Sequence, residues 1–88
     1  MFTSWGVETA RKFSPKEICT ALQCLDSGRY GIVLRAKGIV ADAGGGWIHF
    51  DYVPGELNVR PGGADVTGKL CVIGAQLNTD AVAELFGV

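Results

Sequence analysis

The chain has 88 residues, of which 48% are hydrophobic and 19% charged, and its formal net charge is −1. A chain of this length has room for one hydrophobic core, so residues 1–88 are expected to form a single domain. The composition excludes a disordered segment, and no apolar run reaches the ~18 residues of a membrane span.

The chain opens with a predicted strand over residues 2–9, followed by the clearest element, a helix over residues 15–27. Ser14 is a suitable N-cap, a proline occupies the first helical position, and Glu17 completes an S-x-x-E capping box. Gly28 can adopt the left-handed conformation that ends a helix. Apolar side chains recur every three or four residues, at Ile18, Ala21, Leu22 and Leu25.

The remainder of the chain predicts four more strands. The segment 32–42 is β-branched and apolar, the glycine run 44–46 breaks it, and residues 47–53 complete a hairpin. A short strand over residues 56–60 and a strongly apolar one over 70–74 follow.

A last helix is predicted over residues 80–86, capped by Asn78 or Thr79. The order of elements is therefore β-α-β-β-β-β-α. Short connections make most of the sheet antiparallel, so we expect an α+β two-layer sandwich in which two helices cover one face of a sheet of four to five strands.

Strand alternation separates two sets of side chains along residues 32–42. One set, expected on the open face of the sheet, is Val33, Arg35, Lys37 and Ile39. The other set, expected to meet the helices, is Leu34, Ala36, Gly38 and Val40. The two cations would then lie where a partner could dock, and Gly38 would let another backbone approach closely.

Motifs for catalysis or nucleotide binding are weak. The segment 62–69 contains glycines and a lysine but lacks the spacing of a Walker A loop, and Leu70 stands where a Ser or Thr should bind Mg²⁺. The single histidine, His49, precedes Asp51 by two residues on one strand face, a pair that we interpret as structural.

Metal and nucleic-acid sites are also disfavoured. Cys19 and Cys24 lie about 140° apart around a helix, and Cys71 is expected to be buried in sheet packing, so a shared metal ion is not predicted. Arg35 and Lys37 could bind nucleic acid if Tyr30, Trp47 and Tyr52 lay nearby. However, the isoelectric point is about 5.7 and no RNA-binding motif is present.

Two features bear on the compartment. Three cysteines without paired spacing are typical of free thiols in a reducing environment. The first residues lack the apolar segment of a secretory signal. A cytoplasmic location without membrane association is therefore expected.

The sequence resembles the C-terminal domain of the CobW family of metal-chaperone GTPases. The likeness covers essentially the whole chain, from the segment 11–15 before the first helix to the residues Leu77-Asn78 that open the last one. Between them lie an aromatic-led strand at 47–50 and the apolar strand 70–74, ending in Ile-Gly. The most characteristic matches are Gly31, Arg35, Lys37 and Gly38.

This resemblance implies a non-catalytic accessory domain that serves partner recognition or coupling to a P-loop GTPase domain, in cis or in trans. It places GTP, Mg²⁺ and a transition metal or zinc in that other domain, with no cofactor, metal or nucleotide site in this chain. The implied setting is cobalamin synthesis or zinc homeostasis, with a metalloprotein or a cobaltochelatase as client. Arg35, Lys37 and Gly38 are the expected partner-binding residues. The alternative is a free-standing α+β module that binds a peptide or nucleic acid on its sheet.

Overall fold

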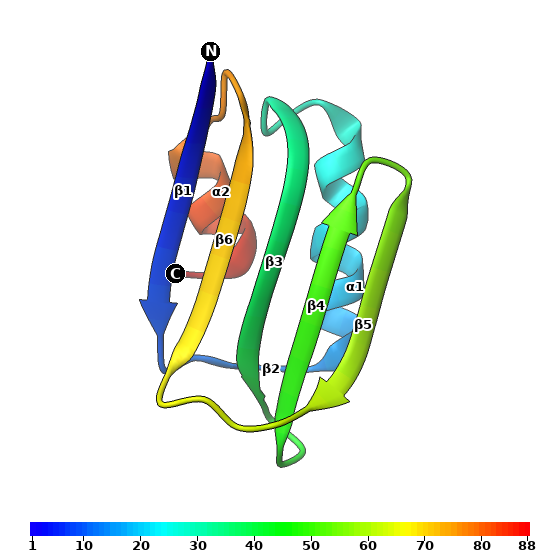
Figure 1. The fold of residues 1–88 in the computed structure, drawn as a ribbon, viewed down its shortest axis with the longest axis vertical. Helices are drawn as coiled ribbons and strands as arrows, with labels where there is room; N and C mark the ends of the chain where they lie inside the picture. The colour runs from blue at the N-terminus through cyan, green and yellow to red at the C-terminus, as the bar shows by residue number, and fades with distance from the viewer.

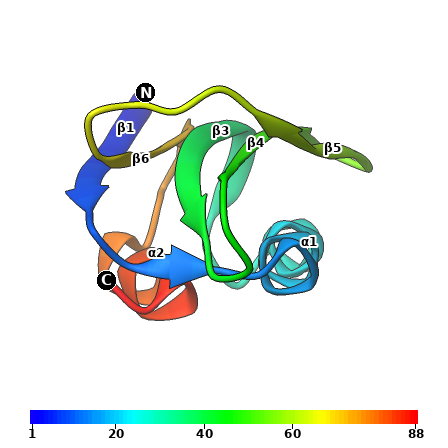
Figure 2. The same ribbon diagram turned by 90° about the horizontal axis from the view of Figure 1, so that it is seen from below.

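A computed structural model describes all 88 residues and shows one sheet with both helices on the same face (Figures 1 and 2). The predicted α+β two-layer architecture is confirmed. The elements are β1 (Phe2–Thr9), β2 (Lys12–Phe13), α1 (Pro15–Cys24), the 3₁₀ turn η1 (Leu25–Ser27), β3 (Ile32–Asp42), β4 (Trp47–Val53), β5 (Glu56–Gly62), β6 (Gly68–Ala75) and α2 (Thr79–Phe86).

The sheet has six strands, one or two more than expected. Five of them lie in the order β1-β6-β3-β4-β5, and all of these neighbours pair antiparallel. The additional strand, β2, has two residues and pairs parallel with Ala41 and Asp42 at the end of β3. Two residues are too few to show the alternation of a strand, so the sequence does not predict β2. The pairing depends on where β3 lies in space.

The capping box predicted at the start of α1 is present. The side chain of Ser14 accepts a hydrogen bond from the Glu17 backbone, and the Glu17 carboxylate accepts one from the Ser14 backbone, which completes the capping box. The α-helix ends at Cys24, and the last predicted turn is the 3₁₀ turn η1, a common way for a helix to tighten at its end. Gly28 then has φ of 81°.

The core lies between the sheet and the two helices. Sixteen buried hydrophobic side chains form it, and α1 packs against β4 and β5. On the same face of the sheet, Phe86 of α2 stacks on Trp5 of β1 and on Phe50 of β4, with ring centroids 6.2 and 6.4 Å apart. Asn78 is the N-cap of α2. No helix is both long and apolar enough to cross a membrane.

A β-bulge near the start of β3 corrects one predicted placement. Val33 pairs with Gly74 and Arg35 pairs with Ile73, so Leu34 is an extra residue in the ladder. Val33 is consequently buried in the core, whereas Leu34 is 39% exposed. Their predicted faces were wrong, because strict alternation fails at a bulge. From Arg35 onward the predicted alternation holds.

Candidate docking face

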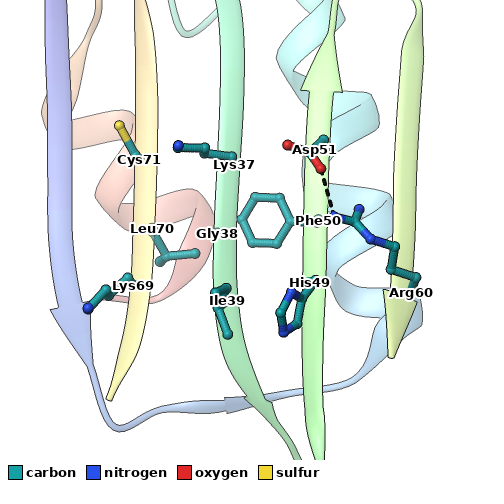
Figure 3. A pocket seen from close by; sticks show the side chains of 10 residues that line it. All are labelled: Lys37, Gly38, Ile39, His49, Phe50, Asp51, Arg60, Lys69, Leu70 and Cys71. Carbon is teal, nitrogen blue, oxygen red and sulfur yellow. Dashed lines mark ion pairs between the residues drawn. The ribbon is translucent and has the colours of Figure 1, made fainter. Parts of the chain in front are cut away.

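The face of the sheet opposite the helices, here called the open face, carries the residues expected to bind a partner. Cross-strand pairing places Lys37 between Cys71 of β6 and Asp51 of β4. In the next row, Ile39 lies between Lys69 and His49. Figure 3 shows these side chains around a hollow of about 410 Å³. Its lining is Lys37, Gly38, Ile39, His49, Phe50, Asp51, Arg60, Lys69, Leu70 and Cys71.

Two of the four cations on this face lack a carboxylate partner. Arg60 pairs with Asp51 at 3.0 Å, as Figure 3 shows, and Lys69 pairs with Asp65 at 3.5 Å. Arg35 and Lys37 are exposed and form no ion pair. The open face therefore presents two neighbouring positive charges that are available to an acidic group from outside.

One end of the open face is covered by residues 63–67, which connect β5 to β6. The connection crosses the ends of β3 and β4 on the side away from the helices (Figure 2). His49 Nε2 donates a hydrogen bond to the Gly63 carbonyl at 2.8 Å. The hydrogen bond from the backbone N–H of Val66, and then the positive charge of Lys69, hold the pKa of Asp65 below its usual range.

The histidine therefore has a structural role in this chain. A Cβ on Gly62 would lie 2.3 Å from the His49 ring, so the glycine is what allows the ring to pack against the backbone of β5. Asp51, its neighbour on the strand face, pairs with Arg60 instead. The two residues do not form the hydrogen-bonded pair that acid–base catalysis would need.

Gly38 is explained largely by packing within the chain. A Cβ at this position would lie 2.5 Å from the Phe50 ring and 2.6 Å from the Lys69 carbonyl oxygen. The backbone that approaches Gly38 is thus that of the neighbouring strand β6. Its own backbone remains in the lining of the hollow.

The aromatic side chains do not gather on the open face. Tyr30 and Tyr52 are 8% and 2% exposed and belong to the core. Trp47, which pairs with Ala41 beside the covered end of the face, points to the same side as Lys37. The exposed Phe2 lies at the opposite end of the face. The arrangement therefore lacks the stacked-base surface on which nucleic-acid binding by a sheet depends.

Sequence reasoning missed a group of exposed apolar side chains at the other end of this face. They surround Arg35 and are here called the apolar patch: Phe2, Ile32, Leu34, Val53 and Ile73. The strand pattern could have revealed Ile73, which alternates with buried Val72. Leu34 joins the group only because of the bulge, which the pattern does not show.

The family model described as "Cobalamin synthesis protein cobW C-terminal domain" matches residues 2–88. The chain belongs to the CobW C-terminal domain family. The match spans every strand and helix described above.

Two solved structures share the fold of this CobW C-terminal domain. The zinc-bound YjiA GTPase from E. coli superposes with a TM-score of 0.80 at 20% identity over 98% of the chain. A zinc-bound triple mutant of YjiA gives a TM-score of 0.75 at 23% identity, also over 98% of the chain. The chain spans only 29% of each of those structures. A search of curated protein sequences gave no match.

The residues of this CobW C-terminal domain do not fit a metal ion. No group of three or more His, Cys, Asp or Glu side chains is placed to hold one. Cys19 and Cys24 lie on α1, on the helix side of the sheet, whereas Cys71 lines the hollow on the open face. The expected burial of Cys71 in sheet packing was wrong, because Leu70 and Val72 on either side of it are the residues that face the core.

The glycine-rich segment 62–69 does not fit a nucleotide either. It comprises the end of β5, the connection across the open face and the start of β6, and no helix begins there. Lys69 pairs with Asp65 from the same segment. The segment therefore lacks the arrangement of a P-loop, in which backbone N–H groups at a helix start and a free lysine hold the phosphates.

Proposed function

We propose that this domain is a non-catalytic accessory module that docks on a P-loop GTPase domain, in cis or in trans, through its open face. The observation that carries the proposal is the pair Arg35 and Lys37, exposed and unpaired on a face where the other two cations have carboxylate partners. Gly38 contributes its backbone to the same hollow. Such charges steer association and fix orientation more than they add affinity.

The family and its structural relatives support a biological setting in metal delivery. The family description refers to cobalamin synthesis, and the YjiA structures with the same fold are of a zinc-bound GTPase. We therefore place the domain in a metal-delivery system, for cobalamin synthesis or zinc homeostasis, with a metalloprotein or a cobaltochelatase as client. The three free thiols fit a cytoplasmic location.

The test is charge reversal on the open face. The double variant Arg35→Glu/Lys37→Glu should keep the fold, because exposed charges contribute little to stability. Its association with a CobW-type GTPase domain that lacks its own C-terminal domain, measured by calorimetry, should weaken about tenfold or more at low salt and less at high salt.

Lys12→Glu/Lys16→Glu is the matched control, because it makes the same charge change at exposed positions of β2 and α1, away from the open face. It should bind like the wild-type chain. Equal binding by both double variants would disprove the role of Arg35 and Lys37. Loss of the folded circular dichroism spectrum in Arg35→Glu/Lys37→Glu would mean that these residues are structural.

A further inference from the structure

Exposed apolar side chains concentrate at one end of the open face. The exposed fractions are 69% for Phe2, 60% for Ile32, 43% for Val53, 39% for Leu34 and 36% for Ile73. The other large exposed hydrophobic residues are Met1, Val88 and the loop residue Val66. Scattered apolar side chains are normal on a protein surface, but a contiguous group from four strands marks an interaction site.

The strand register shows that the patch is contiguous. Ala75 of β6 pairs with Phe2 on one side and Ile32 on the other, so these three side chains form one row across the sheet. In the next row Ile73 pairs with Arg35. The Arg35 side chain lines one depression with Ile73 and another with Val53. Arg35 therefore lies between apolar residues of the patch and forms no ion pair, although Asp51 and Glu56 also line the second depression.

We infer that the apolar patch supplies most of the affinity for the GTPase domain, and that it fits an apolar surface carrying one carboxylate opposite Arg35. The inference rests on the proposed function and adds the chemistry of the partner surface. Burial of the patch supplies the hydrophobic part of the binding free energy. Arg35 fixes the orientation of the partner by pairing with its carboxylate. Lys37 lies outside the patch and mainly raises the rate of association.

Two observations favour the GTPase domain as the occupant. In a protein whose C-terminal domain has this fold, the preceding domain joins at β1, and the first residue of β1, Phe2, is itself part of the patch. A domain attached there is held at high effective concentration beside the patch. A second copy of the chain is disfavoured, because a two-fold contact centred on this patch would bring two Arg35 guanidinium groups together.

The deciding variant is Ile32→Ser/Leu34→Ser, with Val66→Ser as the control for an exposed apolar residue outside the patch. Calorimetry against the same isolated GTPase domain should show binding weakened about tenfold or more by the double variant and unchanged by Val66→Ser. This loss should persist at high salt, unlike that of Arg35→Glu/Lys37→Glu. On the ¹⁵N-labelled wild-type chain, the GTPase domain should shift the amide signals of the patch and leave those of α1 unmoved.

The outcomes separate this inference from the proposed function. If the wild-type chain does not bind the GTPase domain, both are wrong. If it binds, while the double serine variant retains full affinity or the shifted amides lie on the helix side, only the inference about the patch is wrong. Concentration-dependent dimerisation of the wild-type chain in sedimentation experiments, abolished by the double variant, would assign the patch to a second copy and overturn the inference.

Discussion

Tyr52 donates its hydroxyl hydrogen to the carboxylate of Asp26 across 2.5 Å. The same carboxylate oxygen accepts a hydrogen bond from the Gly55 backbone N–H at 3.0 Å. Tyr52 belongs to β4, Asp26 to η1 and Gly55 to the turn between β4 and β5. One exposed side chain therefore ties the end of the first helical segment to the tip of a hairpin.

Removing the hydroxyl should weaken this connection without disturbing the core. Tyr52→Phe keeps the buried ring and should lower the free energy of unfolding by about 1 kcal/mol, the usual contribution of a hydrogen bond. Urea denaturation measures the difference. Tyr30→Phe is the control, because the Tyr30 hydroxyl makes no side-chain hydrogen bond within the chain, and it should be nearly neutral. Equal losses in the two variants would contradict the assigned role of the Tyr52–Asp26 bond.

Acid should destabilise the domain partly through Asp26. Hydrogen bonds from the Tyr52 hydroxyl and then from the Gly55 backbone hold the pKa of Asp26 below its usual range. The unfolded chain therefore takes up this proton first as the pH falls. The stabilisation is complete above the ordinary aspartate pKa of about 4 and is lost as the pH falls through the lower folded-state value.

Urea unfolding at a series of pH values between 7 and 3 tests this dependence. The wild-type free energy of unfolding should decline below about pH 4. Asp26→Asn should decline less steeply, since an amide does not titrate there. Glu17 and Asp65, whose pKa values are also lowered, should account for the slope that remains. Identical slopes for Asp26→Asn and the wild type would show that Asp26 does not contribute.

The start of α1 should depend on Ser14. Ser14→Ala removes the oxygen that accepts the Glu17 backbone N–H and should cost about 1 kcal/mol, or a decrease of about 4–8 °C in Tm. Thermal melts followed by circular dichroism would show it. Ser4→Ala, at an exposed position of β1, provides the comparison and should change Tm little. An unchanged Tm in Ser14→Ala would mean that the cap does not stabilise the helix.

Gly38 should not tolerate a methyl group. In Gly38→Ala, the Cβ would meet the Phe50 ring and the rigid backbone of β6, so we expect a loss of about 1–3 kcal/mol, as in overpacked cores. Gly63→Ala is the matched control, since nothing lies within 4 Å of a Cβ there. Chemical denaturation measures the free energy of unfolding of the two variants, and only Gly38→Ala should be destabilised. A nearly neutral Gly38→Ala would mean that Phe50 repacks without cost.

Nucleotide binding should be absent from this chain. Titration of GTP with Mg²⁺ into the purified domain should give no heat of binding, because segment 62–69 forms neither a phosphate cradle nor a Mg²⁺ site. A CobW-type GTPase domain titrated under the same conditions is the positive control. Micromolar affinity of the present chain for GTP would contradict the assignment of the segment as a structural connection.

Local patterns in the sequence predicted most of the elements, since they depend on neighbouring residues. The capping box at Ser14 places the start of α1, and the glycines at 44–46 place the β3–β4 hairpin within the predicted bounds. What could not be predicted depends on partners distant in sequence. β2 exists because β3 passes beside it, and the bulge at Leu34 is defined by the register against β6.

The open face also combines features that local sequence predicts with features that depend on distant residues. The exposure of Arg35 and Lys37 follows from alternation along one strand, which the sequence contains. The apolar patch combines residues from β1, β3, β4 and β6, so it emerges only when the order of strands is known. The anchoring of residues 63–67 by His49 likewise requires that the connection cross the open face.

The position of β6 has a consequence for synthesis on the ribosome. β1 is the first strand to be made, yet its sole neighbour in the sheet is β6, whose residues are among the last. The hairpins of β3, β4 and β5 can form while the chain is still growing, but both edges of β1 stay open until Ala75 has left the exit tunnel. A nascent chain of this domain therefore completes its sheet late, and a product that terminates before Gly68 leaves an eight-residue strand free to pair with other chains.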